Sequence, residues 1–160
     1  MTAMKKPALQ SPRDGVNVLI VDDDWDTVSI LLDYIRSRFG SESRGVRSLA
    51  RAIHLIGEEG YRPDLVIHDC SPLRYDTDEV DSESAGNELY AFFVDEELPI
   101  VVLSGKSEDE MINREPYRSD LPLAWLEKPL KRESLPDGTS RWVQIDEAVG
   151  AYLSWKASSQ

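Results

Sequence analysis

Five residues whose side chains could act together each stand at or just after the end of a short, largely apolar run. They supply three carboxylates, a hydroxyl and an ammonium: Asp22, Asp23, Asp69, Ser104 and Lys128. Close carboxylates repel one another, and a bound cation relieves that repulsion. Mg²⁺ prefers oxygen ligands and keeps positions open for water and phosphate, while a hydroxyl and an ammonium can bond phosphoryl oxygens. With one carboxylate left as nucleophile, the set predicts a Mg²⁺-dependent phosphoryl-transfer site.

Each of these residues also has an ordinary structural interpretation. An Asp at the end of a strand more often caps a turn or a helix, and Ser104 could cap the helix that follows it. A Lys before a Pro, as at Lys128, is usually a solvated surface charge. The joint pattern favours chemistry, because every residue falls at the same end of its own apolar run.

The elements that must position these residues alternate along the chain. The apolar runs are short and continuous, as in strands buried on both faces of a sheet, and amphipathic helical patterns separate them. The first helix has apolar residues at helical spacing from Val28 to Phe39, with Asp24 as its N-cap. The other expected elements are a weak edge strand at 43–47, a helix around 52–56, a helix from about Ala85, a short helix at 107–119 interrupted by Pro116, and a closing helix at about 139–156.

This alternation predicts an α/β fold in which helices cover both faces of a parallel sheet through right-handed crossovers. In such folds the chemistry lies outside the carboxyl ends of the strands. The five residues are therefore expected to converge on one edge of the sheet.

The composition excludes several other kinds of site and partner. The chain has 30 Asp and Glu against 18 Lys and Arg, a net charge of −12, whereas nucleic acids and anionic membranes bind basic faces. The single Cys70 excludes an intramolecular disulfide and a Cys-cluster zinc site, and two His residues leave no His-rich metal centre. No apolar run could cross a bilayer, and the N-terminus lacks a secretory pattern. We expect a soluble protein of a reducing compartment.

Four segments that contain these residues, VLIVDDD, DLVIHD, PIVVLSG and WLEKPL, resemble the signature segments of the receiver domain of two-component response regulators. The resemblance covers about residues 16–156 and leaves tails at 1–15 and 157–160. It implies a flavodoxin-like, three-layer (βα)5 fold with a five-stranded parallel sheet in the order 2-1-3-4-5.

The resemblance also implies a ligand set for Mg²⁺. Asp69 is then the phosphoacceptor, and Asp22 and Asp23 are the acidic pair that holds the metal with it. The backbone carbonyl of Ser71 completes the set.

The remaining site residues would act on the phosphoryl group. The resemblance implies that Lys128 and Ser104 contact it, and that Ser104 and Trp125 form the switch that responds to it. Lys106 stands where the family tunes the lifetime of the phosphoryl group. His68 should point to the opposite face of its strand from Asp69, so it is not expected to be a ligand.

The segment after the phosphoacceptor departs from the family pattern. An acidic loop of about residues 73–85 replaces a short one. A solvated insertion is the favoured interpretation. The alternative is a lid or partner contact that slows the access of anionic phosphodonors.

The expected function is that of a stand-alone receiver that is no enzyme beyond its own phosphorylation and dephosphorylation. Its phosphodonor would be a histidine kinase or a histidine phosphotransfer protein, and the resemblance implies a cytoplasmic location. Its output would be a downstream protein bound through the face of the fourth and fifth helices and the last strand, or onward phosphate transfer, with a weak homodimer as a further possibility.

Two alternatives stay open at this point. One is a pseudo-receiver, a protein-binding module that is not phosphorylated. The other, more remote, is a phosphatase of the haloacid-dehalogenase type, which would need a further acidic pair after Lys128 and would leave Asp69 without a role.

Overall fold

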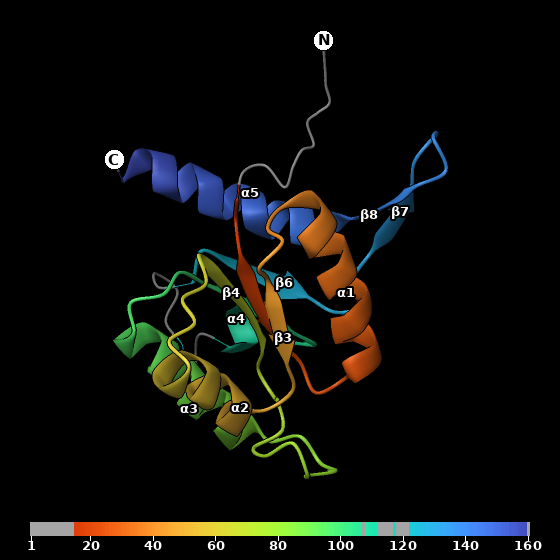
Figure 1. Ribbon diagram of the computed structural model, residues 1–160. Helices are drawn as coiled ribbons and strands as arrows, with labels where there is room; N and C mark the ends of the chain where they lie inside the picture. Colours follow the sequence, from red (N-terminus) through yellow and green to blue (C-terminus); the bar gives the residue numbers. More distant parts are fainter. Residues whose placement is uncertain (1–14, 107, 112–116, 118–121, 160) are drawn as a thin grey trace.

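The computed structural model describes residues 15–106, 108–111, 117 and 122–159, and Figure 1 shows a central sheet with helices on both of its faces. The strands of this sheet are β2 (Val18–Val21), β3 (Arg44–Val46), β4 (Leu65–Asp69), β5 (Ile100–Ser104) and β6 (Ala124–Glu127). All neighbouring strands are parallel, and their order is β3-β2-β4-β5-β6. In order along the chain this is 2-1-3-4-5, so the predicted fold class is confirmed.

The helices divide between the two faces of the sheet. One face carries α1 (Trp25–Arg38) and α5 (Val143–Ser158), and the other carries α2 (Leu49–Ile53), the π-helical turn η2 (His54–Glu58), α3 (Glu83–Asp95) and the short α4 (Glu108–Met111). No helix within the described ranges has the length and apolar character needed to cross a membrane.

The alternation of side chains along each strand explains why the apolar runs are continuous. In β2, Leu19 and Val21 belong to the core beneath α2 and α3, whereas Val18 and Ile20 belong to the core beneath α1 and α5. Successive strand residues face opposite sides of a sheet. Because helices cover both sides here, both sets must be apolar, and the polar residues appear only where the strands end.

Short polar side chains define where the helices begin. Asp24, Ser48 and Ser82 each cap a helix by accepting backbone N–H groups of its first turn. The predicted N-cap of α1 is therefore confirmed. Because Ser82 caps α3, that helix begins at Glu83, slightly before the expected start near Ala85.

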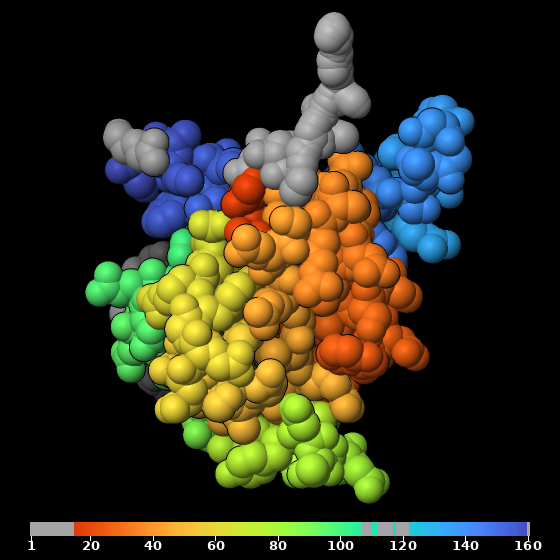
Figure 2. Space-filling model, in the orientation of Figure 1, coloured from red at the N-terminus to blue at the C-terminus, as the bar shows by residue number. Residues whose placement is uncertain are grey.

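The predicted start of the closing helix, at about residue 139, was wrong. Residues 132–142 form an antiparallel hairpin of β7 (Arg132–Ser134) and β8 (Ser140–Trp142), and α5 starts only at Val143. Gly138 has a φ of 90° in the connecting turn, a conformation that glycine adopts without strain. The hairpin projects beyond the body of the molecule (Figure 2, light blue). At the other end α5 continues to Ser158, into the expected tail at 157–160.

The expected helix at 107–119 and the expected N-terminal tail can be compared with the structure only in part. Within the expected helix at 107–119, the structure describes α4 and Tyr117, while Pro116 lies outside the described residues. The same holds for residues 1–14 of the expected N-terminal tail.

The acidic loop is anchored at its beginning and its end. The backbone of Leu73 pairs with the β3–α2 connection, accepting a hydrogen bond from the N–H of Leu49 at 2.8 Å and donating one to the carbonyl of Arg47 at 3.1 Å. The N–H of Ser82 donates to the carbonyl of Pro72 at 2.9 Å. The middle of the loop is exposed and forms the projection in yellow-green in Figure 2. The solvated insertion is thus confined to that middle part.

Candidate functional site

Three carboxylates meet at the carboxyl ends of β2 and β4, as the sequence predicts. Oxygen atoms of Asp22, Asp23 and Asp69 all lie within 4.8 Å of one another. Asp22 is completely buried, and one of its oxygens accepts the backbone N–H of Asp24 at 3.0 Å. Asp69 is 7% exposed and accepts the backbone N–H of Ser71 at 3.3 Å. The backbone thus fixes two of the three carboxylates.

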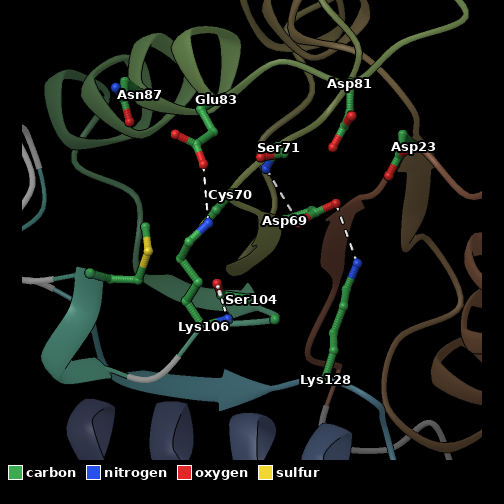
Figure 3. Close-up of a pocket in the computed structure, with 12 residues that line it drawn as sticks. Asp23, Asp69, Cys70, Ser71, Asp81, Glu83, Asn87, Ser104, Lys106 and Lys128 are labelled. Atoms are coloured by element: carbon green, nitrogen blue, oxygen red, sulfur yellow. Dashed lines mark hydrogen bonds and ion pairs between the residues drawn. The ribbon is translucent and has the colours of Figure 1, made fainter.

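The Lys128 ammonium reaches the same cluster from the end of β6. Its Nζ atom lies 3.0 Å from Asp22 Oδ2 and 3.3 Å from Asp69 Oδ2 (Figure 3 draws the contact with Asp69). The parallel pairing of β2, β4, β5 and β6 explains this convergence, because it aligns the strand ends on one edge. Lys128 is therefore a partly buried partner of the acidic cluster and not a freely solvated surface charge.

The environment disfavours the ionised form of all three carboxyl groups. Burial raises the pKa of Asp22, and burial followed by the Asp22 charge raises the pKa of Asp69. Burial and the neighbouring Asp69 likewise raise the pKa of Asp23. Burial alone would lower the pKa of the Lys128 ammonium, but the charges of Asp69 and Asp22 outweigh it and raise that pKa. One ammonium does not neutralise three carboxylates, so negative charge remains in the cluster.

This residual charge fits a divalent cation. Oxygen ligands from a few carboxylates, beside an open pocket, are what Mg²⁺ uses in phosphoryl-transfer sites. Asp22, Asp23 and Asp69 are the residues that would hold it. The backbone carbonyl of Ser71 remains a predicted ligand, since the contact that the structure gives for Ser71 is its N–H to Asp69.

Ser104 ends β5 at the same edge of the sheet. It is buried, and its Oγ accepts the backbone N–H of Lys106 at 2.9 Å. Ser104 and Asp69 line a common pocket of about 400 Å³ with Lys128 (Figure 3). The hydroxyl is thus placed beside the acceptor, while its hydrogen bond holds the turn after β5.

Trp125 lies on β6, on the face that α2 and α3 cover. It is partly buried and packs edge-on against Tyr117, with ring centroids 5.8 Å apart. Its indole Nε1 is buried without a hydrogen-bond partner among the described residues. The role of Trp125 as a switch residue stays a prediction.

His68 is buried on the face opposite Asp69, as expected. Its ring packs against Phe93 and Tyr90, at 5.6 and 6.0 Å between centroids. Burial lowers its pKa to about 4, so the imidazole is neutral at physiological pH. His68 is a core residue and does not face the site.

Two acidic residues that line the site were not predicted as site residues from the sequence. Asp81 and Glu83 line the pocket from the end of the acidic loop and the start of α3. In Figure 3 the Asp81 carboxylate is turned toward the space above Asp69, and its charge contributes to the raised pKa of Asp23. Their positions depend on the path of the loop, which the sequence pattern does not specify. The one available signal was Ser82, whose N-cap role places Glu83 in the first turn of α3.

Comparison with known proteins gives structural relatives only. No family model and no curated protein sequence matches the chain. It is similar to the signal receiver domain of a putative LuxO repressor protein from Vibrio parahaemolyticus, with a TM-score of 0.59, 15% identity and coverage of 89% of this chain and 93% of that one. The receiver domain of a modulated diguanylate cyclase from Desulfovibrio desulfuricans G20 gives a TM-score of 0.60, 19% identity and coverage of 90% and 98%.

A third relative is a complex that contains a phosphate analogue. The CheX–CheY–BeF3–Mg²⁺ structure from Borrelia burgdorferi matches with a TM-score of 0.53 and 19% identity over 75% of this chain and 88% of that one. The sheet order, the convergence of the strand ends and these relatives agree. The chain therefore has the fold of a signal receiver domain.

Proposed function

We propose that this chain is a response-regulator receiver that accepts a phosphoryl group on Asp69. The supporting observation is the position of that carboxylate. Among the three clustered acids, Asp69 alone both contacts the Lys128 ammonium, at 3.3 Å, and lines the pocket. Asp22 contacts Lys128 but does not line the pocket, and Asp23 lines it. A donor that enters the pocket therefore meets Asp69 beside a cation.

The transfer is a substitution at phosphorus. A carboxylate oxygen of Asp69 forms a bond to the phosphorus of a phosphohistidine, and the bond from phosphorus to the imidazole nitrogen breaks. The electron pair returns to the imidazole, which takes up a proton, and Asp69 becomes an acyl phosphate. Attack by water on this group releases inorganic phosphate and restores the carboxylate, so the chain catalyses only its own phosphorylation and dephosphorylation.

Lys128 and a metal ion held by the carboxylates would each stabilise negative charge on the phosphoryl group. A bound Mg²⁺, held by Asp22, Asp23 and Asp69, would neutralise charge on the phosphoryl oxygens. Lys128 pairs with the carboxylates at rest and is close enough to pair with a phosphoryl oxygen once Asp69 is modified. Ser104 supplies a hydroxyl donor to the same pocket from the end of β5.

Phosphorylation then biases a conformational equilibrium. Drawing the Ser104 hydroxyl toward the phosphoryl group breaks its bond with the Lys106 N–H, which shifts the turn after β5. Trp125 lies on the adjacent strand and would change its packing against Tyr117. The affected surface is the face of α4, β6 and α5, which would bind the downstream protein or a second copy of the chain.

The phosphodonor on this proposal is a histidine kinase or a histidine phosphotransfer protein in the cytoplasm. The acidic surface supports a protein partner over nucleic acid or an anionic membrane. The chain's own output would be phosphorylation-dependent binding or onward transfer of the phosphoryl group.

The experiment that tests this proposal is intact-mass spectrometry after incubation with Mg²⁺ and phosphoramidate, whose P–N bond resembles that of phosphohistidine. We expect a Mg²⁺-dependent gain of one phosphoryl group that Asp69→Asn abolishes. Asp81→Asn is the matched control, because it removes another carboxylate of the same pocket and should keep the adduct.

An adduct that persists in Asp69→Asn would move the acceptor to another residue. Absence of any adduct, together with absence of Mg²⁺ binding by calorimetry, would favour the pseudo-receiver alternative.

A further inference from the structure

An ion pair crosses the phosphorylation pocket between two elements that lie far apart in the sequence. Glu83, the first residue of α3, lies 3.1 Å from the Nζ of Lys106, in the turn after β5. Both residues line the pocket that contains Asp69 (Figure 3). The pair thus joins the end of the acidic loop to the turn that Ser104 holds.

The backbone at each end of this ion pair is fixed to the site. On one side the Lys106 N–H donates to Ser104 Oγ at 2.9 Å. On the other side α3 packs tightly on the residue after Asp69, because a Cβ at Gly86 would lie 1.7 Å from the Cys70 carbonyl oxygen. The movable part is therefore the long Lys106 side chain, which can turn its ammonium without displacing either backbone.

The ion pair itself is weak. The side chains of Lys106 and Glu83 are 39% and 57% exposed, and pairs of this kind contribute little to stability because water competes with them. A phosphoryl group carries more negative charge than a carboxylate and offers three acceptor oxygens. An anion bound at Asp69 can therefore take the Lys106 ammonium from Glu83.

We propose that Glu83 is a positioning residue, an inference that rests on the proposed function. It holds the Lys106 ammonium at the wall of the pocket, and this ammonium then leaves Glu83 to pair with the phosphoryl group. Occupation of Asp69 then exchanges one partner of Lys106 for another. Through that exchange the site acts on the start of α3 and the acidic loop, in addition to the turn after β5.

The pocket contains a natural control for this proposal. Asp81 carries the same charge as Glu83 at the same mouth, but the described residues show no hydrogen bond or ion pair for its carboxylate. Removal of either charge should ease the binding of an anion. Only the effect of removing Glu83 should be larger when Lys106 is present, because only Glu83 pairs with that ammonium.

The test is calorimetric titration of the full chain with beryllofluoride, a phosphoryl mimic, at saturating Mg²⁺. Glu83→Gln is expected to tighten binding by about threefold to fivefold, the range set by releasing an exposed ion pair. Lys106→Met is expected to weaken it, and in the Lys106→Met background Glu83→Gln should tighten binding no more than Asp81→Asn does. Asp81→Asn should tighten binding equally with and without Lys106.

A second readout follows the loop directly. Amide hydrogen exchange at residues 73–86 should increase when beryllofluoride binds the parent chain and should already be raised in Glu83→Gln without ligand. Equal tightening by Glu83→Gln in the parent and Lys106→Met backgrounds would overturn the exchange of partners, as would unchanged loop protection. Failure of the parent to bind beryllofluoride at all would overturn the proposed function itself, and this proposal with it.

Discussion

At the scale of single residues, adjacent carboxylates with the same chemistry have different tasks. Asp22, Asp23 and Asp24 are consecutive, yet only the first two belong to the cluster with Asp69. Asp24 instead accepts the backbone N–H groups of Asp26 and Thr27 at the start of α1. Hydrogen bonds to Thr27 lower the pKa of Asp24, whereas burial raises the pKa of Asp23. The backbone direction at the end of β2 therefore separates a metal ligand from a helix cap.

This division predicts different effects of two conservative changes. Asp23→Asn should weaken Mg²⁺ binding by about tenfold or more, since it removes one charged oxygen ligand of the site. Asp24→Asn should leave the affinity within about twofold, because Asn is an equally good N-cap. Calorimetric titration with Mg²⁺ at pH 8 measures both values. Equal losses in the two variants would contradict the assignment of the acidic pair.

His68 predicts a pH dependence of stability. Its folded pKa of about 4 lies below the ordinary value of 6.5, because burial disfavours the charged imidazole. The unfolded chain therefore takes up the proton first, and stability contributed by the neutral ring is lost as the pH falls from 6.5 toward 4. Relative to His68→Leu, the parent should lose about 3 kcal/mol over this interval. Urea unfolding at several pH values gives the comparison, and parallel curves would show that His68 titrates normally.

At the scale of elements, the close approach of α3 to the end of β4 sets the geometry behind Asp69. Gly86 permits that approach, since a Cβ there would overlap the Cys70 carbonyl. Gly86→Ala should destabilise the fold by about 1–3 kcal/mol through overpacking, although alanine favours a helix. Gly150→Ala in α5 meets nothing within 4 Å and should stabilise by about 0.5–1 kcal/mol. Chemical denaturation of both variants distinguishes packing from helix propensity; similar shifts would contradict the close contact.

The elements also show how far sequence reasoning reaches. The sheet strands and Asp22, Asp69, Ser104 and Lys128 were predictable, because continuous apolar runs end at polar residues on one edge.

The β7–β8 hairpin was not predicted. Trp142 has helical spacing to Ile145 and Val149, so the pattern extended the helix backwards, and the exposed strand residues show no alternation of apolar and polar side chains. The Asp137-Gly138 dipeptide was the local turn signal that could have corrected this.

The pocket wall was not predictable for a different reason. Glu83 and Lys106 come together because the acidic loop is anchored through Leu73 and α3 packs closely on the residue after Asp69. No periodicity in the sequence encodes that path. Sequence patterns thus specify what the strand ends carry, whereas the loops decide which further charges surround it.

At the scale of the whole molecule, the charged carboxylates of the site lower the free energy of unfolding of the fold that positions them. Two apolar cores, one on each face of the sheet, hold the strands, and the strand ends bring carboxylates together with raised pKa values. A group whose folded pKa is raised stabilises the fold when protonated, and that contribution is lost as the pH rises through its folded pKa. At neutral pH without a divalent cation, Asp69 should therefore lower the free energy of unfolding.

Asp69→Asn tests this opposition, because the amide keeps the shape of the side chain and removes its charge. Without Mg²⁺ at pH 8, the variant should be more stable than the parent by about 0.5–2 kcal/mol, as is common when a charged functional residue is neutralised. The gain should shrink as the pH falls and the parent carboxyl is protonated. It should also shrink when Mg²⁺ is added, since the cation binds the folded parent more tightly than the variant. Urea unfolding at pH 5 and pH 8, with Mg²⁺ or with NaCl of equal ionic strength, separates cation binding from general screening. A variant less stable than the parent without Mg²⁺ would show that the bond to Lys128 outweighs the burial of Asp69 and the repulsion from Asp22.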